Sequence, residues 1–156
     1  MDEHQFEVYI KSLRGVVFRL AYSMVKNCED ADDITQDAFV KLYLSHENFT
    51  AAENAKAWLI RVTINLCKDM LKSFRYRNRT ELCEDIPCES SEDVSVLEFV
   101  KALSPENSAV IYLFYYEGYS VSEIARLRRT TSAAVRTRLT RARKQLKEML
   151  LKEDDL

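Results

Sequence analysis

Hydrophobic residues recur at intervals of three and four along most of the chain, and this spacing is typical of helices that bury one face. The stripe in the C-terminal third is the most regular: Val135, Leu139, Ala142, Leu146 and Met149. Comparable stripes lie within residues 5–26, 27–44 and 52–74. Only two glycines and two prolines occur among 156 residues, which argues against the many tight turns of a sandwich or barrel. We therefore expect an all-α fold.

Signals for helix starts divide this pattern into separate elements. Asn27 is a favourable N-cap for the helix that follows it. Ser104 followed by Pro105 is typical of a second helix start. Ser120 with Glu123 three residues later forms a capping box, in which the two side chains satisfy free backbone N–H groups reciprocally.

The segment that begins at Ser120 predicts a helix-turn-helix motif. Its short helix is interrupted at residues 129–131, and Thr131 or Ser132 then caps the long C-terminal helix. The side of the long helix away from its apolar stripe is small and basic. The candidate DNA-contacting residues there are Arg136, Thr137, Arg138, Thr140, Arg141, Arg143 and Lys144. A short helix, a brief turn and a longer basic helix form the arrangement that reads DNA in the major groove.

The net charge of −2 conceals a strong separation of charge along the chain. Residues 56–79 carry seven basic residues and one acid, residues 81–98 carry seven acids and no base, and residues 99–152 carry eleven basic residues and four acids. Two basic blocks around an acidic one indicate two modules that face a polyanion, joined by a linker. The predicted parts are a first helical domain at 1–79, an acidic linker at 80–97, a helix-turn-helix domain at 98–152 and a tail at 153–156.

A basic ridge runs along the predicted helix at residues 52–74, on a different face from its apolar stripe. The ridge consists of Arg61, Asn65, Lys68, Lys72 and Arg75. Trp58 lies between the two faces, and Phe49 lies in the polar segment before the helix. Cations that neutralise phosphates, together with aromatic rings on which bases stack, are typical of single-stranded nucleic-acid binding. A solvated basic face without a ligand is the alternative.

The predicted helix at residues 27–44 carries a mixed acidic and apolar strip beside its buried stripe. The strip consists of Asp33, Gln36, Asp37, Val40, Tyr43 and Leu44. It is either a solvated face or a docking surface for a basic partner. A third interpretation is carboxylate catalysis, although no Glu-x-x-His motif follows and neither histidine is placed to complete a metal site.

Metal, cofactor and membrane signals are weak in this sequence. The four cysteines form no C-x-x-C pair and two histidines are too few for a zinc finger, so we expect no metal and no cofactor. The N-terminus has no apolar signal run, and no stretch approaches the ~20 apolar residues of a membrane span. We expect a cytoplasmic protein without membrane insertion.

These modules, in this order, resemble the short, two-domain extracytoplasmic-function sigma factors of the sigma-70 family of bacterial RNA polymerase. The run NCEDADDITQDAFVKLY, beginning at Asn27, is similar to the polymerase-binding helix of the family. The run AWLIRVTINLCKDMLK, beginning at Ala57, is similar to the promoter-melting helix. The segment from Leu103 through EGYSVSEIA to RARKQL resembles the domain that reads the upstream promoter element. The resemblance covers nearly the whole chain.

The resemblance implies three contact surfaces. Docking on the clamp helices of the largest polymerase subunit would use Asp33, Gln36, Asp37, Val40 and Tyr43. The opened −10 promoter element would be held by Phe49, Trp58, Arg61, Asn65, Lys68 and Lys72. The −35 element would be read by the helix-turn-helix residues listed above, and the second domain would also contact the polymerase flap. The implied partners are core RNA polymerase and promoter DNA; an anti-sigma factor is a common further partner in the family.

Three positions depart from the pattern of the family. Arg128 and Arg129 occupy the helix-turn-helix turn, where the family commonly has a hydrophobic residue and glycine. A residue other than glycine in a left-handed turn conformation costs on the order of 1 kcal/mol. Ala133-Ala134 replaces the usual Gly-Thr, and Ser108 replaces a frequent arginine.

The sequence thus predicts a sigma factor that carries out no covalent chemistry and has no catalytic residues. A stand-alone helix-turn-helix transcriptional regulator is the first alternative, because it would share the C-terminal motif but bind its operator without polymerase. An enzyme that uses the carboxylates of residues 29–37 is the second alternative.

Overall fold

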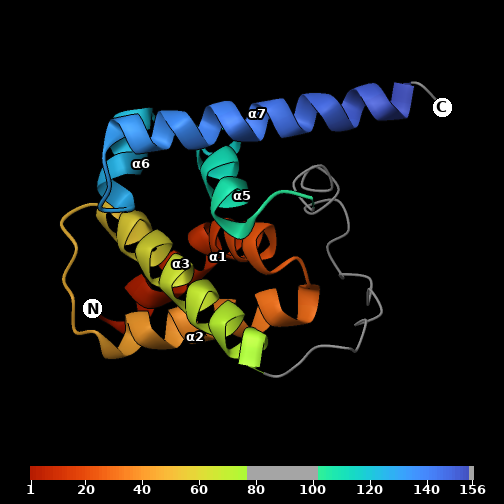
Figure 1. Ribbon diagram of the computed structural model, residues 1–156. Helices are drawn as coiled ribbons and strands as arrows, with labels where there is room; N and C mark the ends of the chain where they lie inside the picture. Colours follow the sequence, from red (N-terminus) through yellow and green to blue (C-terminus); the bar gives the residue numbers. More distant parts are fainter. Residues whose placement is uncertain (77–101, 155–156) are drawn as a thin grey trace.

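The computed structural model describes residues 1–76 and 102–154, whose arrangement is shown in Figure 1. Every regular element in these two ranges is helical, which confirms the predicted all-α fold. The elements are α1 (Glu3–Val25), α2 (Cys28–Leu44), α3 (Ala52–Tyr76), α5 (Pro105–Ile111), the π-helix η2 (Tyr112–Tyr116), α6 (Val121–Leu127) and α7 (Ser132–Asp154). The predicted acidic linker at residues 80–97 lies outside the described residues.

The predicted helix starts are confirmed by their capping hydrogen bonds. The Asn27 side chain accepts a hydrogen bond from the backbone N–H of Asp30 at 3.0 Å, at the start of α2. At the start of α6, the Glu123 N–H donates to the Ser120 hydroxyl at 3.1 Å, and the Ser120 N–H donates to the Glu123 carboxylate at 3.0 Å. These bonds satisfy donors that would otherwise lack partners in the first turn.

Helices α1, α2 and α3 form the first module (residues 1–76), in which each helix packs against the other two. Leu42 of α2 and Leu59 of α3 are fully buried, as their predicted stripes require. Helix α3 is buried more widely than its predicted stripe, because Ile60, Ile64 and Cys67 also have no exposed surface. α3 therefore has a second apolar face, which needs a second packing partner.

The second module (residues 102–154) provides that partner. Its long helix α7 lies across α5 and α6, against which it buries Val135, Leu139 and Ala142. Beyond this contact α7 extends away from the rest of the molecule in Figure 1, and Leu150 and Leu151 on this extension are about half exposed, at 48% and 54%. The C-terminal apolar stripe is thus buried only over its first half.

The two modules share one hydrophobic core. Ile60, Ile64 and Cys67 of α3 belong to the same buried cluster as residues of α5, η2 and α6. Helix α1 also packs against α5 and η2, and the Lys26 ammonium donates a hydrogen bond to the Leu103 carbonyl. This close packing of the modules was not predicted from the sequence.

The turn of the helix-turn-helix motif includes a left-handed backbone conformation, which is unfavourable for an arginine. Arg128 has φ −92°, whereas Arg129 has φ +51°, in the left-handed region that glycine adopts without strain. The departure from the family pattern at this turn therefore places a non-glycine residue, Arg129, in the left-handed region. The strain amounts to about 1 kcal/mol.

Candidate nucleic-acid interface

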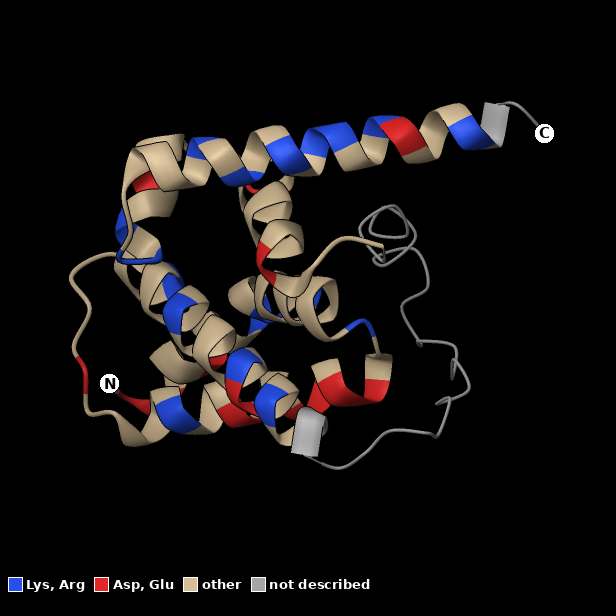
Figure 2. Cartoon of the chain, viewed as in Figure 1, with Lys and Arg blue, Asp and Glu red and all other residues tan. Residues whose placement is uncertain are grey.

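The predicted DNA-reading residues lie on the exposed face of α7. Arg136, Thr137, Thr140 and Arg141 are all exposed, and Figure 2 shows basic residues repeated along the helix. Thr137 and Thr140 donate their hydroxyls to backbone carbonyls one turn earlier, at 3.0 and 2.9 Å, which fixes both hydroxyl oxygens at the helix surface. Among the described residues, neither Arg136 nor Arg141 makes an ion pair.

Two further arginines of this set contact the protein itself. Arg138 donates a long hydrogen bond of 3.4 Å to the Asn107 side-chain oxygen on α5. Arg143 donates to the Tyr115 hydroxyl and lies over the ring of Phe114. Arg138 and Arg143 therefore belong to the flank of α7 that faces the module, whereas Arg136 and Arg141 face solvent.

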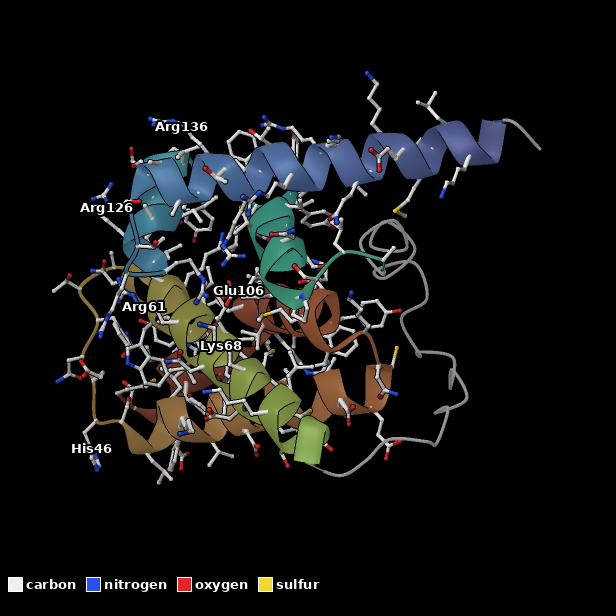
Figure 3. All side chains as sticks on the ribbon, in the orientation of Figure 1. His46, Arg61, Lys68, Glu106, Arg126 and Arg136 are labelled. Carbon is white, nitrogen blue, oxygen red and sulfur yellow. The ribbon has the colours of Figure 1, made fainter. Side chains whose placement is uncertain are left out.

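The basic ridge of α3 is partly exposed and partly engaged in a contact within the protein. Arg61, Asn65 and Lys72 are exposed. The Lys68 ammonium, however, lies 3.1 Å from a carboxylate oxygen of Glu106, which begins the second module (Figure 3). The side chain of Arg75 lies outside the described side chains. The structure thus places one ridge residue in a contact between the modules.

Phe49 and Trp58, both candidates for the −10 contact, lie together and pack into the first module. Their ring centroids are 6.2 Å apart with an edge-to-face geometry, and Phe49 makes a similar contact with Tyr9 at 6.3 Å. Both side chains are partly buried against the cluster that includes Leu59. Contacts of this kind hold the loop before α3 against the bundle.

The mixed strip of α2 is exposed along its length. Asp33, Gln36 and Asp37 face solvent, and Val40 and Tyr43 are each 55% exposed. The apolar end of the strip borders a groove of about 560 Å³ between α1 and α2. Exposed apolar side chains gathered in one place are typical of surfaces that bind a partner.

Glu117 is the centre of a polar contact between the modules, and its side chain is only 8% exposed. It accepts a hydrogen bond from the Tyr112 hydroxyl at 2.6 Å and faces Lys56 of α3 at 3.1 Å and Arg19 of α1 at 3.6 Å. Burial alone would raise the pKa of Glu117, but the hydrogen bonds from Tyr112 and Lys56 outweigh it and hold that pKa below its usual value.

Glu106 forms the second polar contact. Its carboxylate accepts two hydrogen bonds from Arg128, at 2.5 and 2.6 Å, and pairs with Lys68 across the module boundary. Burial would raise the pKa of Glu106, yet the positive charges of Arg128 and Lys68 lower it overall. Arg128 of the strained turn is thereby tied to the first module through one carboxylate.

Sequence reasoning missed these contacts between the modules. Arg19, Lys56 and Glu117 carry no local signal, because each is an ordinary charged residue on a helix or turn. The apolar residues Ile60 and Ile64 outside the main stripe of α3 were the available sign that this helix packs on two sides. Arg128 and Arg129 were noted, but only as departures from a pattern.

Two features are absent from residues 1–76 and 102–154. No group of three acidic, histidine or cysteine side chains is placed to hold a metal ion. No helix combines the length and the apolar composition that crossing a bilayer requires.

Comparison with protein families matches both modules. The model described as "Sigma-70 region 2" matches residues 9–82, and that described as "Sigma-70, region 4" matches residues 93–146. The ECF RNA polymerase sigma factor SigE of Mycolicibacterium smegmatis is 33% identical over 150 residues, which are 87% of this chain and 58% of that protein. The probable RNA polymerase sigma factor RfaY of Xanthomonas campestris is 27% identical over 94% of this chain, which spans 40% of that protein.

A third relative is matched over most of its own length. The RNA polymerase sigma factor SigV of Bacillus subtilis is 30% identical, with 88% of this chain and 86% of that protein covered.

Solved structures share the fold. The sigma factor RpoE, solved with the anti-sigma factor NepR from Bartonella quintana, superposes with a TM-score of 0.71 at 23% identity, over 94% of this chain and 96% of that chain. CnrH, solved with the cytosolic domain of CnrY, superposes with a TM-score of 0.64 at 24% identity, over 96% and 89% of the two chains.

Proposed function

Because the chain belongs to the extracytoplasmic-function group of the sigma-70 family, we propose that it directs bacterial RNA polymerase to promoters. In this role it binds core polymerase in the cytoplasm, recognises the −10 and −35 elements, and performs no covalent chemistry. One observation carries the proposal: a single chain exposes an acidic and apolar strip on α2, a basic ridge on α3 and a basic face on α7.

The strip on α2 is the proposed polymerase contact, on the clamp helices of the largest subunit. Val40 and Tyr43 supply apolar area that is half exposed in this arrangement, and Asp33 and Asp37 supply charge for a basic partner. Apolar contacts surrounded by complementary charges give both affinity and orientation. The second module would contact the flap of the polymerase.

The ridge of α3 is the proposed contact with the opened −10 element. Arg61, Asn65 and Lys72 are exposed and ready to meet phosphates and bases. Lys68 would join them only after it leaves Glu106. In this proposal Phe49 and Trp58 shape the loop beside the ridge, since their rings pack mainly on the first module.

The exposed face of α7 is the proposed −35 reader. Arg136 and Arg141, with Thr137 and Thr140 between them, would reach base edges or the nearest phosphates in the major groove. The flanking residues Arg138, Arg143 and Lys144 would mainly meet phosphates. Arg138 and Arg143 would first give up their contacts with Asn107 and Tyr115.

The two DNA contacts reinforce each other in this proposal. The first domain at residues 1–79 and the second at residues 98–152 are joined in one chain. When one domain binds its promoter element, the effective concentration of the other domain at its own element therefore rises. The linker at residues 80–97 sets the distance that both can span. An anti-sigma factor is proposed as a further partner, because the sigma factor RpoE was solved in complex with one.

Run-off transcription on a random promoter library tests the proposed function. Core polymerase with the purified chain should produce transcripts from templates that share two conserved elements, and core polymerase alone should not. A gel-shift assay supplies the contrast with a stand-alone regulator. Tight, specific binding of the isolated chain to promoter DNA, without stimulation of core polymerase, would contradict the proposal.

A further inference from the structure

The arginines of the helix-turn-helix turn line a cavity between the two modules. The cavity has a volume of about 270 Å³. Its charged lining residues are Lys68 from α3, Arg128 and Arg129 from the turn, Arg138 from α7 and Glu106 from α5. Four cationic residues and one carboxylate thus line a single partly open cavity, to which both modules contribute.

The carboxylate cannot neutralise all four cations. The same Glu106 oxygen faces both the Arg128 guanidinium, at 2.5 Å, and the Lys68 ammonium, at 3.1 Å. Arg129 makes no ion pair among the described residues, and Arg138 is bonded only to a neutral amide at 3.4 Å. Like charges gathered around one cavity repel one another, and an anion bound between them would relieve that repulsion.

The backbone supports a functional interpretation of Arg129. Its φ of +51° is strained for an arginine and would suit a glycine without strain. Strain of this kind persists where the surrounding structure enforces it, and it is concentrated at functional sites. Arg129 is the fourth cationic residue that lines the cavity.

We propose that this cavity binds a small multivalent oxyanion, such as a chain of two or three phosphates, which links the first module to the second. Guanidinium groups bind phosphate oxygens in pairs, and the ammonium of Lys68 adds a point charge. The lining contains no aromatic ring that could stack on a base, and its apolar part is limited to Val110 and Val135. A cavity of this size has no room for a nucleic-acid duplex. Lys68 and Arg138 are also proposed DNA contacts, so the oxyanion and promoter DNA would compete for these two side chains.

Calorimetric titration of the full chain with inorganic pyrophosphate tests this site. At constant ionic strength we expect saturable binding of one pyrophosphate per chain, weaker binding of sulfate and none of chloride. Arg129→Gly should weaken pyrophosphate binding about tenfold or more, because it removes one charged hydrogen-bond donor. This variant keeps the fold, since glycine suits the backbone at that position, and circular dichroism checks it.

Two further variants distinguish the proposed site from general charge attraction. Lys68→Gln, on the other module, should weaken binding about as much as Arg129→Gly. Arg126→Gln is the matched control, because Arg126 is an exposed arginine of α6 that does not line the cavity (Figure 3). An equal loss in Arg126→Gln, or no saturable binding in the unaltered chain, would overturn the site. An unchanged affinity in Lys68→Gln would overturn the link between the modules.

Discussion

Replacement of Glu117 by glutamine would test what holds the two modules together. The Glu117 carboxylate joins the Tyr112 hydroxyl of its own module to Lys56 and Arg19 of the other. Glutamine keeps the shape and can still accept the hydrogen bond from Tyr112. It removes the negative charge that both cations face, so the two positive charges are left at the interface without a carboxylate opposite them.

The size of the effect follows from burial. Removing one partner of a buried ion pair costs about 3–5 kcal/mol. The side chains of Lys56 and Arg19 keep 20% and 16% of their exposure, so water compensates part of the loss. We therefore expect about 2–3 kcal/mol against the closed arrangement, which lowers the melting temperature by roughly 5–10 °C.

Thermal unfolding and small-angle X-ray scattering would measure this prediction together. A closed chain of this length should have a radius of gyration of about 15 Å, and Glu117→Gln should increase it. Glu148→Gln, at an exposed position of α7, is the matched control for loss of one acid. If Glu117→Gln equals that control in both measurements, the ion pairs do not hold the modules together.

A double-mutant cycle of Glu117→Gln with Lys56→Met would measure the interaction energy between these two side chains, apart from their other contacts. The double variant should lose less unfolding free energy than the sum of the two single losses, because either substitution already breaks the contact. Additive effects would show that Glu117 stabilises the protein without Lys56.

Further predictions concern pH, capping, DNA reading and salt. The pKa values of Glu106 and Glu117 are lower in the folded protein than the unfolded value of about 4.3. The stability that these two carboxylates contribute is therefore complete above that pH and is lost as the pH falls below it. Urea unfolding between pH 6 and pH 3 should show this loss of unfolding free energy, and the loss should be smaller in Glu117→Gln. Ser120→Ala should cost about 1 kcal/mol of unfolding free energy, whereas Ser122→Ala, in the same helix but outside the capping box, should not. Arg141→Ala should weaken −35-dependent transcription and leave polymerase association, measured by co-sedimentation, unchanged. If about six phosphates are contacted, raising salt from 50 to 200 mM should weaken DNA binding roughly 10³-fold in a fluorescence anisotropy titration.

The local features of this fold were predictable from the sequence because they depend on neighbouring residues. The capping box at Ser120 and the N-cap at Asn27 need only a side chain and the backbone three residues later. The buried stripe of α7 over Val135 and Leu139 follows from the period of the helix. The left-handed backbone at Arg129 lies where the resemblance to the family had marked a departure from a common glycine.

The packing between the modules depends on residues far apart in the chain and was not predictable in this way. Glu117 lies near Arg19 only because α1 packs against η2, and the spacing of residues in the sequence does not predict that contact. The roles of the candidate DNA and polymerase residues stay predictions. For Lys68 in particular, the structure adds a partner, Glu106, with which DNA would have to compete.

The shared core also gives the protein a response to temperature. Opening the modules would expose apolar surface of α3 and α5, including Ile60, Ile64 and Val110, that is now buried. Exposure of apolar surface raises the heat capacity, and hydrophobic stabilisation weakens on cooling. The free energy of opening should therefore vary with temperature along a curve, and its hydrophobic part should fall in the cold.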